Sequence, residues 1–148
     1  MSKPRLIFLL NSAQRHLLQW MAAQQTSQVA TPPTPSQSGL LFVLDKTDGA
    51  SMGQLAQALD MEAPGISGLV QRTEAFGWVT RQPCTQDGRT QRVWLTPHGR
   101  QQLPPLKQAL AHINARLTAG FTDDELHTVA KWLEHVRHLD THHHREEP

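Results

Sequence analysis

Only one stretch of this chain has the character of β-strands, and it lies between segments that favour helix. Residues 79–81 and 91–95 are rich in β-branched and aromatic side chains, and the turn-forming loop 83–88 separates them. Two short strands joined by such a loop predict a β-hairpin over residues 78–96. We therefore expect a mostly α-helical fold that carries a small β-wing.

Helical signals fill the remainder of the chain. Leu6 begins a long amphipathic helix, with apolar residues spaced three and four apart, that extends to about Gln25. The proline-rich segment 31–35 ends this pattern and serves as a stiff connector. Three further helices are predicted over 36–47, 51–59 and 63–76. Another helix begins at Thr96-Pro97, is kinked or broken at Pro104-Pro105, and resumes over 106–117. The last predicted helix runs from Thr122 to about Asp140.

Three helix starts carry the spacing of a capping box, in which a Ser or Thr is followed three residues later by Gln or Glu. The two side chains then accept hydrogen bonds from backbone N–H groups that the first helical turn leaves unpaired. The pairs are Thr34 with Gln37, Ser51 with Gln54, and Thr122 with Glu125.

Composition narrows the class of protein. A chain of 148 residues fits one domain. The longest unbroken apolar run is Leu6–Leu10, which is far too short to cross a bilayer. The single cysteine, Cys84, excludes an intrachain disulfide framework. No catalytic motif stands in a suitable setting, so we expect a soluble, cytoplasmic protein that is not an enzyme.

The first helix and the two C-terminal helices have no obvious partner within a compact single chain. Their apolar faces would be buried best against a second copy, so the sequence predicts a homodimer. Trp20 and Trp132 are expected to anchor this interface or to border a pocket beside it.

The middle of the chain has the order of a winged helix-turn-helix: three short helices and then the hairpin. We expect residues 34–100 to form this unit within a single domain over 1–148. The flanking segments 1–28 and 101–140 would be dimerisation helices, and 141–148 a flexible tail.

The residues of this predicted winged helix-turn-helix resemble those of the MarR (multiple antibiotic resistance regulator) family of winged-helix transcription regulators. The resemblance rests on Leu55-Ala56, on the segment Phe76-Gly77-Trp78-Val79-Thr80-Arg81, and above all on Asp87-Gly88-Arg89 followed by Val93-Trp94-Leu95-Thr96-Pro97-His98-Gly99. It implies a homodimeric regulator that binds a pseudo-palindromic DNA site, usually a repressor released by a small molecule or by oxidation. The recognition helix would be 63–76 and the wing 81–94.

The resemblance also implies roles at the wing. Arg89 is similar to the arginine that enters the minor groove in this family, and Asp87 to the residue that holds the direction of that arginine. The expected partners are double-stranded DNA, a second copy of the chain and an unidentified small aromatic effector. No cofactor or metal is expected.

Side-chain chemistry supports the same face for DNA. If the apolar residues of helix 63–76 turn inward, six positions face outward: Gly65, Ser67, Gly68, Gln71, Arg72 and Ala75. Arg favours guanine and Gln favours adenine. Further expected contacts are Ser51, at a helix start suited to phosphate, and Arg92 on the wing. Gly65 and Gly68 depart from the longer polar side chains that are common in the family.

Simpler interpretations remain for several of these residues. Arg72 could pair with Glu74 instead of contacting a base, and Arg92 could be a strand-edge charge. Cys84 is either a redox sensor or an incidental loop residue, of which the second is the simpler. The alternative function is a winged-helix metal sensor or protein-interaction module that acts through the His-rich C-terminus, where His135, His138 and His142 share one helical face.

Overall fold

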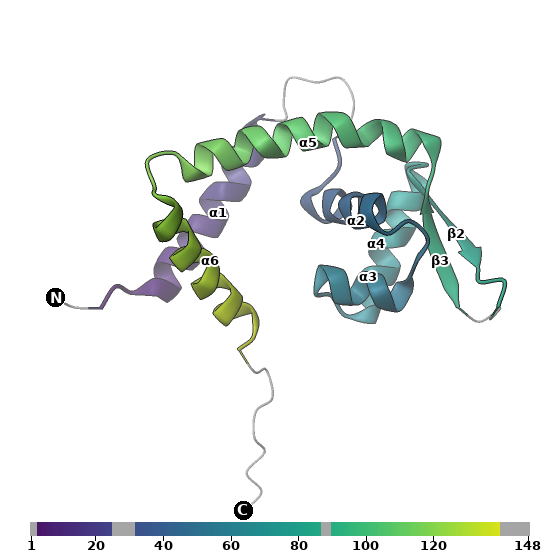
Figure 1. The fold of residues 1–148 in the computed structure, drawn as a ribbon, viewed down its shortest axis with the longest axis horizontal. Coiled ribbons are helices and arrows are strands. Elements are labelled where there is room, and N and C mark those ends of the chain that lie inside the picture. The colour runs from purple at the N-terminus through teal and green to yellow at the C-terminus, as the bar shows by residue number, and fades with distance from the viewer. Residues whose placement is uncertain (1–2, 25–31, 87–89, 140–148) are drawn as a thin grey trace, which may run out of the picture.

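The computed structural model describes residues 3–24, 32–86 and 90–139, which form helices and one small sheet (Figure 1). The predicted fold class, mostly α with a small β-wing, is confirmed. The elements are α1 (Leu6–Gln24), α2 (Pro35–Lys46), β1 (Ala50–Ser51), α3 (Met52–Leu59), α4 (Ala63–Ala75), β2 (Val79–Pro83), β3 (Gln91–Leu95), α5 (Pro97–Thr118) and α6 (Asp123–Arg137). The predicted tail 141–148 lies outside the described residues.

All three predicted capping boxes are present. At the start of α2, the backbone N–H of Gln37 donates to Thr34 Oγ1 over 3.2 Å, and the N–H of Thr34 donates to Gln37 Oε1 over 3.0 Å. The same reciprocal bonds begin α3 and α6. The caps thus fix where these helices begin to within a residue of the prediction.

The predicted hairpin is confirmed, and a short third strand joins it. β2 and β3 pair antiparallel with Val79 opposite Leu95 and Pro83 opposite Gln91. β1 pairs with the other edge of β3, so the strand order is β1-β3-β2. The sequence did not predict β1, because a two-residue strand has no periodicity of its own.

The hydrophobic core lies between α2, α3, α4 and the sheet, in a unit that we call the winged head (residues 35–95). Its fully buried side chains come from all of these elements. They are Leu40, Leu41, Leu44, Leu55, Ile66, Leu69, Val70, Val79 and Val93. The inward stripe predicted for α4 is therefore confirmed, and buried Thr73 satisfies its hydroxyl by donating to the Leu69 carbonyl over 2.7 Å.

The junction of the sheet with α5 is built from one threonine and two glycines. Thr96 caps α5 by accepting from the N–H of Gly99 over 3.0 Å, and its hydroxyl donates to the Gly77 carbonyl. Gly77 has a φ of +76°, which suits glycine. A Cβ atom on Gly99 would lie 1.9 Å from the Trp78 carbonyl oxygen, so only glycine fits there.

The prolines at 104 and 105 do not break α5, which runs from Pro97 to Thr118 as one helix (Figure 1). The sequence predicted a kink or a break at these prolines, and the break was wrong. Proline φ is compatible with a helix, and the cost lies in the missing N–H groups and the crowding of the preceding turn. Leu103 is buried, and Leu106 packs against the same core, so side-chain packing holds the helix on both sides of the prolines.

α1, the second half of α5, and α6 form an arm that extends from the winged head (Figure 1); we call them the scaffold helices. Nine of their large apolar side chains are exposed in the single chain. They are Leu6, Ile7, Phe8, Leu9, Leu18, Leu110, Leu117, Val129 and Leu133. Within the described residues, none of the helices is both long and apolar enough to span a membrane.

Candidate nucleic-acid interface

α3 and α4 form the helix-turn-helix, and the tight turn between them depends on Asp60. Asp60 adopts a left-handed conformation with φ +53°, which aspartate tolerates better than most residues. The N–H of the next residue, Met61, donates to the Ala56 carbonyl over 3.0 Å. This closes α3 and sends the chain into α4 at a sharp angle.

The outward face of α4 is polar and open to solvent. Gly65, Ser67, Gln71 and Arg72 are exposed, and Gly68 is half-buried. Ala75, the sixth position that the sequence placed on the outside of this helix, is exposed as well. The structure therefore brings all of the predicted base-reading side chains to one face, and their contact with DNA stays a prediction.

The two glycines on this face accommodate longer neighbours. A Cβ atom on Gly68 would lie 3.1 Å from Nη1 of Arg72, and one on Gly65 would lie 3.2 Å from Cε of Met61. The guanidinium of Arg72 thus lies over Gly68, one turn back along α4. Gly68 gives Arg72 the space for this conformation.

A shallow groove runs beside α4 at the base of the wing. We call it the wing-base groove; it has a volume of about 600 Å³ and is lined by Ser51, Met52, Gly53, Ser67, Arg81, Thr90 and Gln91. It brings together Ser51 and Ser67, which the sequence predicted as DNA contacts. The hydroxyl oxygen of Ser51 accepts from the N–H of Gln54 over 3.2 Å, which leaves its hydrogen able to donate.

Arg81 lines the same groove and was not among the predicted contacts. Its Nη2 donates to Glu74 Oε1 over 3.0 Å, and its backbone N–H donates to Glu74 Oε2 over 3.0 Å. Nε donates to Oε2 over a longer 3.5 Å. The bond from the Arg81 side chain lowers the pKa of Glu74. Glu74 thus pairs with Arg81 rather than with Arg72.

The predicted wing contacts Asp87 and Arg89 lie outside the described residues, so their roles stay predictions. Arg92 lies on β3 and is half-buried. Its Nη1 donates to the Gly49 carbonyl over 2.9 Å, which ties β3 to the turn before β1. The sequence did not foresee this structural bond, which uses one of the five N–H groups of the guanidinium.

Asp48 joins the wing to the start of α5. Its Oδ1 accepts from the N–H of Leu95 over 2.9 Å, and Oδ2 pairs with the guanidinium of Arg100. These partners are 47 and 52 residues away in sequence, so no local pattern could have found the network. It holds the base of the wing against α2 and α5.

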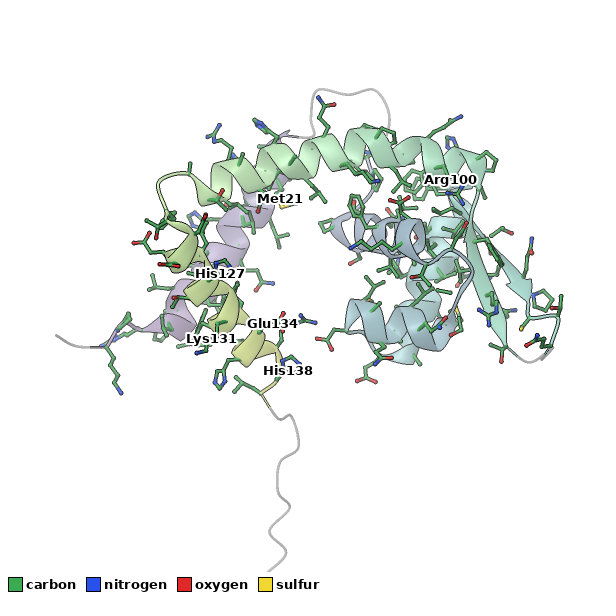
Figure 2. The ribbon with its side chains drawn as sticks, in the orientation of Figure 1. Met21, Arg100, His127, Lys131, Glu134 and His138 are labelled. Atoms are coloured by element: carbon green, nitrogen blue, oxygen red, sulfur yellow. The ribbon has the colours of Figure 1, made fainter. Side chains whose placement is uncertain are left out.

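The histidines of α6 do not gather into a metal site within the described residues. His127 lies in the second turn of α6 and His138 directly follows the helix, with Lys131 and Glu134 between them (Figure 2). No group of three His, Cys, Asp or Glu side chains in the described ranges could hold an ion. His142 lies outside these ranges, and Cys84 is half-buried in the wing loop.

Comparison with known proteins links this arrangement to a family. Residues 32–90 match the model of the MarR family. A protein of Thauera aromatica, named as a transcriptional regulatory protein for the hcr operon, is 29% identical over 108 residues, which cover 73% of this chain and 65% of that protein. The chain thus spans just under two thirds of the length of this relative.

Two solved structures share the fold over most of the chain. A transcriptional regulator from Pseudomonas aeruginosa is 29% identical with a TM-score of 0.72, covering 89% of this chain and 99% of that chain. BpsR of Bordetella bronchiseptica, whose DNA binding is regulated by 6-hydroxynicotinic acid, is 20% identical with a TM-score of 0.73, covering 90% and 98%. At 20% identity, the second likeness is one of fold.

Proposed function

We propose that this chain, whose residues 32–90 match the model of the MarR family, is a transcriptional regulator of that family: a cytoplasmic homodimer that binds a specific DNA site and releases it when an effector binds. The observation that carries the proposal is the exposed polar face of α4, which lies beside the wing-base groove. A helix presents its outward side chains to the major groove in this fold, and the flanking surfaces contact phosphates.

Each predicted contact has a role in this proposal. Gln71 and Arg72 read base edges, Gly65 and Gly68 let α4 approach the DNA closely, and Ser51 and Ser67 donate to phosphates. Arg89, oriented by Asp87, enters the minor groove from the wing, and Arg92 contributes its charge near the backbone.

A second copy of the chain would cover the exposed apolar side chains of the scaffold helices. Many large apolar side chains exposed on the same helices are typical of protein interfaces. The dimer would present two copies of α4 to half-sites about 34–36 Å apart on a pseudo-palindrome. Residues 1–28 and 101–140 would then serve dimerisation, and residues 34–100 would serve DNA binding.

Repression relieved by a small aromatic effector completes the proposal. The support is the fold shared with BpsR, whose DNA binding responds to 6-hydroxynicotinic acid. An effector releases DNA only if it binds more tightly to a dimer whose heads have the wrong separation. Its target here would be a pocket between the scaffold helices and the winged head.

Selection from a pool of random duplex DNA tests the proposal. We expect the native chain to enrich a two-fold symmetric site. Arg72→Ala should lose about 1–3 kcal/mol of discrimination at one base position in each half-site, and Arg89→Ala should weaken binding to all sequences. Lys131→Ala on α6 is the control, since Lys131 lies away from the winged head (Figure 2). Enrichment of no symmetric site by the native chain would overturn the proposal.

A further inference from the structure

We propose that Arg81 is a contact to the DNA phosphate backbone and that Glu74 positions it for that role. The inference rests on the proposed function, which supplies the DNA. It adds a residue to the interface that the motifs of the sequence did not indicate.

Arg81 lies beside the groove that a phosphate would enter. It lines the wing-base groove together with Ser51 and Ser67, and about a third of its side chain is exposed. In the sheet it is opposite Val93, whose side chain is fully buried. The backbone of Arg81 is therefore held rigidly by the core, and its long side chain reaches the groove.

Glu74 fixes the plane of the guanidinium. Two neighbouring nitrogens, Nε and Nη2, donate to the two carboxylate oxygens, and the Arg81 backbone N–H donates to the same carboxylate. A guanidinium has five N–H groups in a fixed fork, so three of them are not engaged by Glu74. Such planar pre-organisation suits Arg to phosphate recognition.

The carboxylate of Glu74 does not cancel this role. Glu74 is not among the residues that line the wing-base groove, whereas Arg81 is. A phosphate in the groove would therefore approach the guanidinium more closely than the carboxylate. Coulomb energy falls with distance and is weakened by the high dielectric near the surface, so the nearer cation dominates.

The salt dependence of operator binding tests this role. The slope of log K against log salt is negative, and each lost phosphate contact makes it less steep by about 0.9. A dimer loses two such contacts. We therefore expect Arg81→Gln to bind the selected operator more weakly at low salt. Between about 50 and 200 mM salt, the native protein should lose roughly tenfold more affinity than the variant.

Three further variants make the result specific. Arg81→Lys keeps the charge and should keep the native slope. Glu74→Gln leaves the cation in place and should also keep the slope, while its affinity changes because the guanidinium is held less firmly. Arg100→Gln removes another ion-paired arginine, one that does not line the groove, and should leave the slope unchanged.

A purely structural pair would behave differently. Arg81→Gln and Glu74→Gln would then lower the melting temperature alike, and both would retain the native salt slope; that result would overturn the inference. It would leave the proposed function intact, because the native chain would still bind its operator with a steep slope. Failure of the native chain to bind any duplex would instead overturn the proposed function.

Discussion

At the scale of single residues, Gly68 shows how an unfavourable helix residue can serve a neighbour. Glycine within a helix costs about 1 kcal/mol relative to alanine. In α4 it leaves the space in which the Arg72 guanidinium lies, with 3.1 Å between Nη1 and the position of a Cβ atom. The conformation of Arg72, and hence the base it can reach, depends on that space.

We predict that Gly68→Ala stabilises the winged head and changes its base preference. The free energy of unfolding should rise by up to about 1 kcal/mol, while preference should shift at the base position that Arg72→Ala relaxes. Urea unfolding and DNA selection measure the two effects. Gly53→Ala is the control: a Cβ there meets nothing within 4 Å, so stability should rise and that base preference should not move. An unchanged preference in Gly68→Ala would contradict the prediction.

Glu74 should make the stability of the chain depend on pH. Its pKa is lowered in the folded protein by the bond from Arg81, so the carboxylate stabilises the fold above its unfolded pKa and loses this effect as pH falls through the folded pKa. Because the pair is about one-third exposed, its contribution should be no more than about 1 kcal/mol.

The prediction is that Glu74→Gln lowers the free energy of unfolding at pH 7 and that the difference from the native chain shrinks below about pH 4.5, the ordinary value for glutamate. Urea unfolding at several pH values measures it. When Glu74→Gln is made in the Arg81→Gln variant, the change in the free energy of unfolding should not depend on pH in this way. A difference that stays constant from pH 7 to pH 3 would mean that the charge pair does not stabilise the fold.

At the scale of elements, the start of α5 depends on close backbone approach. The Trp78 carbonyl oxygen occupies the place where a Cβ of residue 99 would lie, 1.9 Å away. We predict that Gly99→Ala destabilises the winged head by about 1–3 kcal/mol or more, because backbone must move to admit the methyl group. Urea unfolding measures the loss, with Gly53→Ala as the matched glycine that should not show it.

Elements were predictable where the signal is local. The boxes at Thr34, Ser51 and Thr122 fixed three helix starts, and the apolar spacing of α4 identified its inward and outward faces. β1 was missed because its pairing with β3 lies about 40 residues away. The break at Pro104 was wrong because packing of Leu103 outweighed the local cost of proline.

The residues of the candidate interface were likewise predictable where the signal is local and not where it depends on distant parts of the chain. Ser67 and Arg72 were predicted from periodicity alone, and the structure exposes both. The pairing of Glu74 with Arg81 needed the chain reversal at Gly77, which places β2 beside α4. Neither the groove nor the bond from Arg92 to Gly49 has a sequence signature, because each depends on tertiary structure.

At the scale of the whole molecule, the exposed apolar side chains of the scaffold helices predict a dimer. We expect light scattering after gel filtration to give about twice the chain mass of 16.6 kDa. Phe8→Glu combined with Leu133→Glu should yield a folded monomer that has lost operator binding, because charges in an apolar interface are costly. Gln57→Glu, which adds a charge on the exposed surface of α3, should stay dimeric. A native chain that is monomeric at micromolar concentration would contradict the prediction.

Because α5 continues through two prolines, a bend at the prolines would move the far half of the helix relative to the winged head. Pro104 and Pro105 have no N–H to bond the carbonyls one turn earlier, so bending should be easiest there. From Leu106 to Thr118 the helix extends about 20 Å. A change of about 10° at the prolines would therefore move its far end by roughly 3–4 Å relative to the head. Two-fold symmetry would double that displacement to about 7 Å, roughly a fifth of the 34–36 Å between half-sites.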